Sequence, residues 1–276
     1  MSTAVSERDL TLWRSWIGRE EVRAQRLDVE SLRRYAAATG ESLDVETSLP
    51  ALAHWAWFLP VAAASEIGED GHPKRGGFLP PVSLPRRMFA SSSMRFPAPV
   101  LIDENATLTS TIADVKHRGG RSGTLVFVEV ERRIAQAGRV RVEERQTVVY
   151  RDAGDPVPAI VEAPEAQVAD AWRPGPVDLF RFSAVTFNSH RIHYDRAYAT
   201  GPEGYPGLVV HGPLTAAKLF AHARDHAGRA PSAFAFRAQA PLFASQPVRL
   251  AAGEAEGEYR ALRCDGEVAM TATVAF

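Results

Sequence analysis

Cysteine is nearly absent from this sequence, and so is any long hydrophobic run. A single cysteine, Cys264, among 276 residues excludes an internal disulfide and disfavours a structural zinc site. No apolar stretch approaches the roughly 20 residues that a membrane-spanning helix needs. The charged N-terminal stretch MSTAVSERDLTLW lacks the apolar run of a secretory signal. We therefore expect a cytoplasmic protein with no membrane partner.

An excess of charge of either sign is also missing. The 32 basic and 33 acidic residues give a formal net charge of −1, which removes the electrostatic basis for bulk binding of nucleic acid. Hydrophobic residues make up 45% of the chain, which is ample for a core. The length allows one large domain or two of ordinary size, and we expect a monomer or homodimer.

Helix-capping residues mark the first part of the chain. We expect a short amphipathic helix within residues 10–25, and a second helix from an N-cap at Asp28 to a stop at Gly40. The strongly aromatic stretch 50–60 is expected in the core, with the wall of a ligand cavity as the alternative. Residues 68–85 are rich in glycine and proline, which predicts an irregular loop.

Alternating apolar and polar residues then predict antiparallel strands in two sets. A proline-rich linker, residues 152–178, separates the sets. Before the second set, a helix is expected from Pro213, tolerated in a first turn, to a stop at Gly228. The expected strands cover residues 94–102, 106–118, 123–136, 139–151, 232–244, 248–257, 258–264 and 267–276.

The two halves of the chain repeat each other. Residues 32–42 align with 179–189, and residues 94–108 align with 236–250, at offsets of 147 and 142. In the first half, the counterpart of the second-half central helix is the stretch 78–89, which leaves room only for a shorter helix. We therefore expect one half to carry the catalytic residues and the other half to form the walls of the site.

The repeat predicts a division into domains. We expect residues 1–151 to form a degenerate N-terminal half and residues 179–276 to form a catalytic C-terminal half, joined by the linker 152–178. Arg95 falls on Arg237 in the alignment, so these two residues should occupy equivalent strand positions.

The densest group of polar side chains follows the linker. The segment NSHRIHYD places Asn188, His190, Arg191, His193 and Asp195 within eight residues. An imidazole titrates near neutral pH and serves as acid or base, so His193 is the candidate for proton transfer, with a satisfied core histidine as the alternative. Asp195 is expected to cap the short helix RAYAT.

A second dense segment, GLVVHGPL, precedes the central helix. Gly212 comes directly before Pro213, so its backbone N–H should point along the positive end of the helix dipole and hold an oxyanion. His211 is expected to shape this turn and to contact substrate rather than to bind a metal. No spaced set of histidine, cysteine and carboxylate side chains supports a metal site.

These segments resemble a known family. NSHRIHYD is similar to the D-x-N-P-(I/V)-H-x-D motif of MaoC-like, R-specific enoyl-CoA hydratases, with His193 on the motif histidine and Asp195 on the last acid. Asn188, His190 and Arg191 depart from the Asp, Asn and Pro of the motif. With GGFLPPVSLPRRM and GYPGLVVHGPL, the chain resembles the hydroxyacyl-thioester dehydratases that include mesaconyl-CoA and itaconyl-CoA hydratases. The resemblance implies an α+β double hotdog fold, with two antiparallel sheets each wrapped on a helix.

The resemblance also implies a hydro-lyase that acts on a short enoyl-CoA or 3-hydroxyacyl-CoA without a cofactor. Hydration needs a deprotonated water, a proton at the α-carbon and a stabilised thioester oxygen. His193 would transfer protons and the Gly212 N–H would hold the oxyanion. Asn188 cannot act as a base, but its amide can orient water. Either His193 performs both proton transfers or another group helps.

Three arginines are candidates for substrate binding. Arg191 could meet a substrate carboxylate or a CoA phosphate through its planar fork, and Arg86 and Arg87 could bind CoA phosphates. A solvated surface position is the alternative for all three.

Two other functions stay open from the sequence. A hotdog thioesterase would need a carboxylate or activated water near the thioester carbonyl, which Asn188 cannot supply. A non-catalytic acyl-CoA-binding protein would explain the missing Asp, but His193 and Gly212 argue against it.

Overall fold

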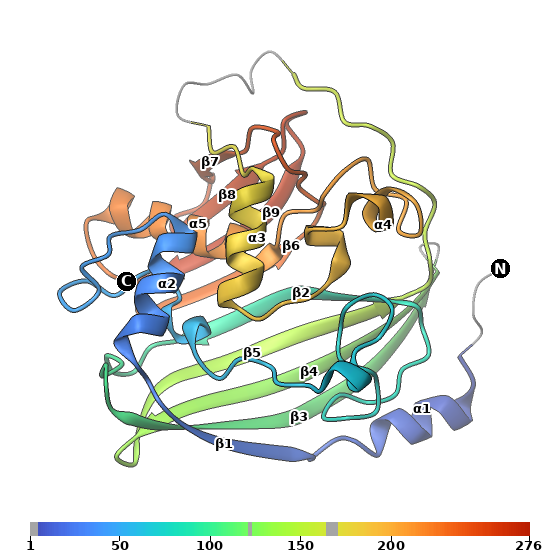
Figure 1. Cartoon of the computed structure of the whole chain (residues 1–276), viewed down its shortest axis with the longest axis horizontal. Helices are drawn as coiled ribbons and strands as arrows, with labels where there is room; N and C mark the ends of the chain where they lie inside the picture. Colours follow the sequence, from blue (N-terminus) through green and yellow to red (C-terminus); the bar gives the residue numbers. More distant parts are fainter. Residues whose placement is uncertain (1–4, 121–122, 164–170) are drawn as a thin grey trace.

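One continuous antiparallel sheet, of nine strands in the described part of the chain, organises the fold (Figure 1). The computed structural model describes residues 5–120, 123–163 and 171–276. The strand order is β1-β3-β4-β5-β2-β6-β9-β8-β7, so β2 and β6 join the two halves edge to edge. The strands are β1 (Glu20–Arg26), β2 (Arg86–Arg95), β3 (Asn105–Gly120), β4 (Gly123–Gln136), β5 (Arg139–Arg151), β6 (Ala233–Ala238), β7 (Arg249–Ala252), β8 (Glu258–Leu262) and β9 (Val268–Ala275).

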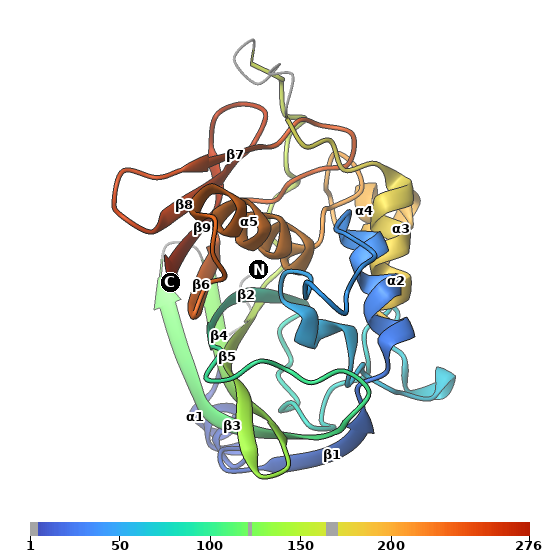
Figure 2. The ribbon, with the colours of Figure 1, turned by 90° about the vertical axis from the view of Figure 1, so that its left-hand side faces the viewer.

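Helices α2, α3 and α5 lie together on one side of this sheet (Figure 1), and α5 runs along strands β7, β8 and β9 (Figure 2). None of the helices within the described ranges combines the length and apolarity needed to cross a bilayer. The helices are α1 (Glu7–Arg14), α2 (Val29–Thr39), α3 (Pro176–Val185), α4 (Arg196–Thr200) and α5 (Gly212–Ala227), with 3-10 turns η1 (Ala53–Ala56), η2 (Ala64–Glu66) and η4 (Arg191–His193).

The predicted caps are confirmed. Asp28 accepts a hydrogen bond from the backbone N–H of Ser31, and Gly40 ends α2 in the left-handed conformation with a φ of 69°. Asp195 caps α4, and Gly228 ends α5 at a φ of 65°. Side-chain acceptors and left-handed glycines satisfy backbone groups that helix ends leave without partners.

The two halves share one plan, which is the double hotdog that the sequence predicts. Arg95 ends β2 and Arg237 is the next-to-last residue of β6, and both are exposed beside a buried neighbour. Gln25 pairs with Ala106 where β1 meets β3. At the aligned second-half positions, Trp172 and Val248 form an isolated antiparallel bridge, so the second half keeps a trace of an edge strand.

One strand follows the expected short helix near the N-terminus. The short helix expected within residues 10–25 is α1, which ends at Arg14; the later part of that range belongs to β1 (Glu20–Arg26), which pairs with β3. This edge strand is largely exposed and charged, as is common for edge strands. Tertiary pairing therefore makes a strand of a segment whose local pattern did not predict one.

Prolines explain two further corrections in the first half. The strand expected at 94–102 ends at Arg95, because Pro97 and Pro99 cannot donate ladder hydrogen bonds. The short helix expected within 78–89 is absent; the stretch has no helix or strand up to Pro85 and then enters β2. The first half therefore has no described counterpart of α5 at that place.

The aromatic stretch 50–60 is core, as predicted. Trp55, Trp57 and Phe58 belong to the main apolar cluster, which α5 shares through Leu214 and Leu219. A smaller cluster of Ile192, Tyr198, Ala199, Val209 and Phe243 packs beneath η4 and α4. This cluster packs the polar motif against the segments of Val209 and Phe243, which pair with each other in an isolated antiparallel bridge.

The proline-rich linker follows the surface of the second half. Val157 donates to the carbonyl of Gly204, and Ala163 donates to that of Cys264, each at 2.8 Å. α3 begins at Pro176, inside the expected linker. Residues 164–170 of this linker lie outside the described residues.

Candidate active site

The segment NSHRIHYD forms a tight turn between α3 and α4. After α3 ends at Val185, Phe187 adopts a left-handed φ of 49° and reverses the chain. Asn188 Oδ1 then accepts a hydrogen bond from the backbone N–H of His190 at 3.0 Å. Asn side chains stabilise turns in this way, so Asn188 holds the backbone that presents His190 and η4.

His193 lies on η4 with one ring nitrogen committed. The side chain is buried, and Nδ1 lies 2.7 Å from the carbonyl oxygen of Val209. Nδ1 therefore carries the hydrogen and donates it, which leaves Nε2 as the basic nitrogen of the neutral ring. No hydrogen bond from the described residues reaches Nε2. Burial lowers the pKa of His193 to about 4, against the Val209 hydrogen bond, which raises it.

His211 supports the His193 ring from behind. The two rings stack with centroids 3.6 Å apart and planes 19° from parallel. His211 is fully buried, with Nε2 2.9 Å from the hydroxyl of Ser183 and Nδ1 without a partner in the described structure. Burial lowers the pKa of His211 well below its usual value. The pair is therefore neutral at pH 7, and His211 fixes the plane of the catalytic candidate.

Gly212 begins α5 directly after His211. Its N–H lies in the first helical turn, where an intrahelical acceptor is lacking, and no acceptor from the described residues replaces it. A Cβ at this glycine would approach the carbonyl of Phe89 no closer than 3.8 Å, which is ordinary contact. The N–H is thus free to bind an anion at the positive end of the helix dipole, next to the His193–His211 stack.

A loop of the first half completes the site. Asp70 Oδ2 lies 2.9 Å from His72 Nδ1, and the His72 ring lies 3.9 Å from that of His190, centroid to centroid. The His190 ring is in turn 5.4 Å from the His193 ring and nearly perpendicular to it. Four imidazoles, those of His72, His190, His193 and His211, therefore form one row across the junction of the halves.

The charges in this row favour neutral imidazoles beside an ionised carboxylate. Burial and then the nearby His72 and His193 rings lower the pKa of His190 to about 2. Burial also lowers the pKa of His72, while its hydrogen bond to Asp70 opposes the shift. Burial resists ionisation of Asp70, but hydrogen bonds from His72 and the charge of Arg87 hold the pKa of that carboxyl well below its usual range.

Comparison with known proteins identifies the family. Residues 52–244, more than half of the chain, match the family hydroxyacyl-thioester dehydratase type 2. A mesaconyl-C(4)-CoA hydratase of Chloroflexus aurantiacus is 44% identical over 95% of this chain and 97% of its own length. The chain belongs to the hydroxyacyl-thioester dehydratase type 2 family. It is therefore a hydro-lyase.

Solved structures agree with the fold of this dehydratase. HtdX of Mycobacterium tuberculosis superposes with a TM-score of 0.63 at 18% identity, over 93% of this chain and 99% of the other. A second Mycobacterium tuberculosis protein, described as a double hotdog, gives a TM-score of 0.53 at 11% identity, over 94% of this chain and 95% of its own. At these identities the likeness concerns the fold alone.

The three candidate arginines differ in how many hydrogen-bond and ion-pair partners their guanidinium groups already have within the dehydratase. Arg191 bonds Asp195 through Nε and Nη2, donates to the carbonyl of Glu69, and lies 4.1 Å over the Tyr198 ring. Arg86 is buried in an ion pair with Glu203, 3.1 Å from Nε to Oε2. Both guanidinium groups therefore have internal partners that a substrate would have to displace.

Arg87 is the arginine of the dehydratase whose charge acts on the row of imidazoles. It is half-buried, and Nη2 donates to the carbonyl of Pro73 at 3.2 Å. Its charge acts on Asp70, His72 and His190. Of the three arginines, Arg87 is thus the one whose field reaches the site.

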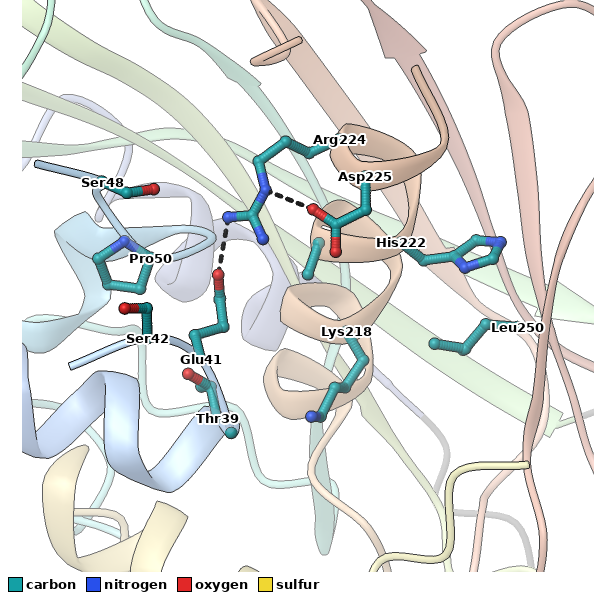
Figure 3. A pocket seen from close by; sticks show the side chains of 12 residues that line it. Thr39, Glu41, Ser42, Ser48, Pro50, Lys218, His222, Arg224, Asp225 and Leu250 are labelled. Atoms are coloured by element: carbon teal, nitrogen blue, oxygen red, sulfur yellow. Dashed lines mark hydrogen bonds and ion pairs between the residues drawn. The ribbon is translucent and has the colours of Figure 1, made fainter. Parts of the chain in front are cut away.

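A separate cavity of about 440 Å³ lies between the end of α2 and the middle of α5 (Figure 3). Lys218 and Arg224 line it from α5, and Arg224 bonds Glu41 at 2.7 Å and Asp225 at 2.9 Å. None of its lining residues belongs to the imidazole row or to the NSHRIHYD segment. This cavity is therefore not the candidate active site.

Asp70 and His72 were not predicted as site residues from the sequence. Both lie in the glycine- and proline-rich stretch that was expected only to form a loop, far from His190 along the chain. The structure brings a ligand atom from each of Asp70, His72 and His190 within 4.8 Å of the others. The one available signal was the segment Asp-Gly-His itself. It places two side chains with acid/base chemistry in a loop, and functional sites often lie in loops.

Proposed function

We propose that this dehydratase hydrates a short, carboxylated enoyl-CoA, with mesaconyl-CoA as the first candidate and itaconyl-CoA as the second. The relative that is 44% identical carries the name mesaconyl-C(4)-CoA hydratase. The observation that carries the proposal is the basic Nε2 of His193 beside the N–H of Gly212, neither of which has a hydrogen-bond partner among the described residues. A base and an oxyanion donor at one place are what hydration of an enoyl thioester requires.

In the hydration direction, His193 Nε2 takes a proton from water as the water oxygen bonds to the β-carbon. The electron pair of the double bond moves towards the thioester, and the Gly212 N–H donates to the oxygen that gains negative charge. The proton then passes from His193 to the α-carbon, which restores the neutral imidazole. His211 keeps the ring in plane, and Asn188 holds the turn that carries it.

Arg87 is proposed to attract the carboxylate of the substrate. The predictions for Arg191 and Arg86 stay predictions, but their ion pairs with Asp195 and Glu203 make them weaker candidates. Arg87 lacks such a carboxylate partner at bonding distance within the described residues. A guanidinium with free N–H groups binds a carboxylate by two parallel hydrogen bonds.

Replacing Arg87 tests this assignment. Arg87→Ala should raise KM for mesaconyl-CoA about tenfold or more, because a charge-assisted hydrogen bond contributes on the order of 1.5–3 kcal/mol. For crotonyl-CoA, which has no free carboxylate, KM should change less. Arg191→Ala tests the competing assignment, and it should affect both substrates alike if Arg87 holds the carboxylate. Equal effects of Arg87→Ala on the two substrates would remove the carboxylate role.

One assay tests the proposed function. The protein is incubated with mesaconyl-CoA, itaconyl-CoA and crotonyl-CoA, while enoyl absorbance and free thiol are followed together. Loss of absorbance without thiol, fastest for mesaconyl-CoA, is the expected result. Release of thiol would instead identify a thioesterase, and no change with any substrate would leave a binding protein.

Further expectations stay part of this proposal. We propose that residues 1–151 form the wall-supplying half, 152–178 the linker and 179–276 the half that carries His193 and Gly212. A CoA thioester is the expected partner and nucleic acid is not. The cytoplasm and a monomer or homodimer remain the expected location and assembly.

A further inference from the structure

The Asp70–His72 pair has no part in the function proposed above, although it lies in the imidazole row. Asp70 Oδ2 is 2.9 Å from His72 Nδ1, and Asp70 Oδ1 accepts from the backbone N–H of His72 at 2.9 Å. The carboxylate thus binds one residue twice and fixes its ring. With Nδ1 donating to the carboxylate, the neutral His72 ring presents a bare Nε2.

The loop that carries the pair is fitted closely to the second half. Arg191 donates its backbone N–H to the carbonyl of Asp70 at 2.9 Å, and Ser189 Oγ donates to the carbonyl of Gly71. Gly71 has a φ of 87°, and a Cβ there would lie 1.8 Å from the carbonyl oxygen of Ser189. Only glycine allows this approach, which places His72 against His190.

We propose that His72 is a second catalytic residue, which accepts a hydrogen bond from the attacking water at Nε2, and that Asp70 is its positioning residue. This inference rests on the proposed hydration. It assigns to His72 the place beside the histidine that a carboxylate holds in the related motif, where this chain has Asn188. Asn188 Oδ1 already accepts from the His190 N–H, and we assign the second hydrogen of the water to the bare Nε2 of His72.

The step balances without a further proton donor. Water gives one hydrogen bond to His193 Nε2 and one to His72 Nε2. Only the proton on the His193 side is transferred as the oxygen bonds to the β-carbon, and it returns to the α-carbon. The hydrogen that faces His72 stays on the new hydroxyl group. His72 therefore keeps its protonation state while it aims the oxygen lone pair.

The surroundings of His72 favour a neutral acceptor over a metal ligand. The groups whose charges or rings face it are Asp70, Arg87, Arg75 and His190. Two guanidinium groups disfavour a divalent cation at Asp70, His72 and His190, although their ligand atoms are close enough for one. The same positive charges oppose protonation of His72, and so preserve its lone pair.

The test compares kcat and KM of His72→Leu, Asp70→Asn, the double variant and His193→Ala, with His117→Leu in β3 as control. His72→Leu should lower kcat by about 10² with little change in KM, because a positioned hydrogen bond to the reacting water is lost. Asp70→Asn should lower kcat by about tenfold, and the double variant should fall no further than His72→Leu, since Asp70 acts through His72. Circular dichroism checks folding; if His72→Leu does not fold, Asp70→Asn decides alone.

Four outcomes would overturn the role proposed for His72. If His72→Leu keeps native kcat while His193→Ala is inactive, this inference is overturned and the proposed function stays intact. If His72→Leu does not fold, native kcat in Asp70→Asn has the same meaning. Additive losses in the double variant overturn it as well, because they give Asp70 a separate structural role. Loss of activity in EDTA with recovery in Zn²⁺ overturns it in favour of a metal site. Wild-type protein without hydration of any enoyl-CoA overturns the proposed function and the inference together.

Discussion

At the scale of single residues, burial sets the chemistry of this site. His193, His190 and His211 all lie where the charged form is poorly solvated, so their pKa values fall below the usual range near 6.5. His193 should therefore titrate at lower pH than an ordinary histidine, because its pKa is lowered to about 4. A histidine that is neutral across the physiological range keeps a lone pair on its ring, but the lowered pKa also makes it a weaker base than a free histidine.

The sign of the pH effect on stability follows from these lowered values. The unfolded chain binds protons at histidines near pH 6.5, whereas the folded chain does not until lower pH. Stability should therefore be full above about pH 6.5 and fall as the pH drops towards 4. For His193 alone the loss at pH 5 is about 2 kcal/mol. Denaturant unfolding at pH 8 and pH 5 measures it, and His193→Gln should lose less stability than wild type over this interval.

At the scale of elements, the loop around Gly71 joins the halves. Gly71→Ala would meet a carbonyl oxygen at 1.8 Å in addition to its left-handed φ of 87°. Gly18 supplies the matched control, since its φ is 86° and nothing lies within 4 Å of a Cβ there. Gly18→Ala should cost only the backbone term of about 1–2 kcal/mol.

Gly71→Ala is expected to cost clearly more than Gly18→Ala and to lower kcat as well, because the clash displaces Ser189 and with it the NSHRIHYD turn. Chemical denaturation and the hydration assay measure the two effects. Equal stability losses in the two variants, with native kcat in both, would contradict the close fit of loop and motif.

The sequence predicted the elements that depend on local chemistry. Caps at Asp28 and Asp195 and the stop at Gly228 are set by hydrogen bonds and backbone conformation within a few residues. β1 was missed because pairing with β3, not local pattern, makes it a strand. The alignment of Arg95 with Arg237 held, since a repeat preserves position even where single residues have diverged.

At the scale of the whole molecule, the site is assembled from two halves that the sequence separates widely. His193 and Gly212 could be proposed as site residues from the sequence because motif and helix start lie close along the chain. Asp70 and His72 could not be, because only the three-dimensional fit of a first-half loop brings them to His190. Arg191 bonds its i+4 neighbour Asp195 and lies over the Tyr198 ring, two partners that only the folded structure reveals.

The central claim is that His193 carries the proton in an enoyl-CoA hydration, and kcat of His193→Ala with mesaconyl-CoA tests it most directly. The account predicts a kcat lower by about 10²–10⁴ in a folded protein whose KM changes little, because the lost interaction belongs to the transition state. A folded His193→Ala protein with native kcat would contradict it.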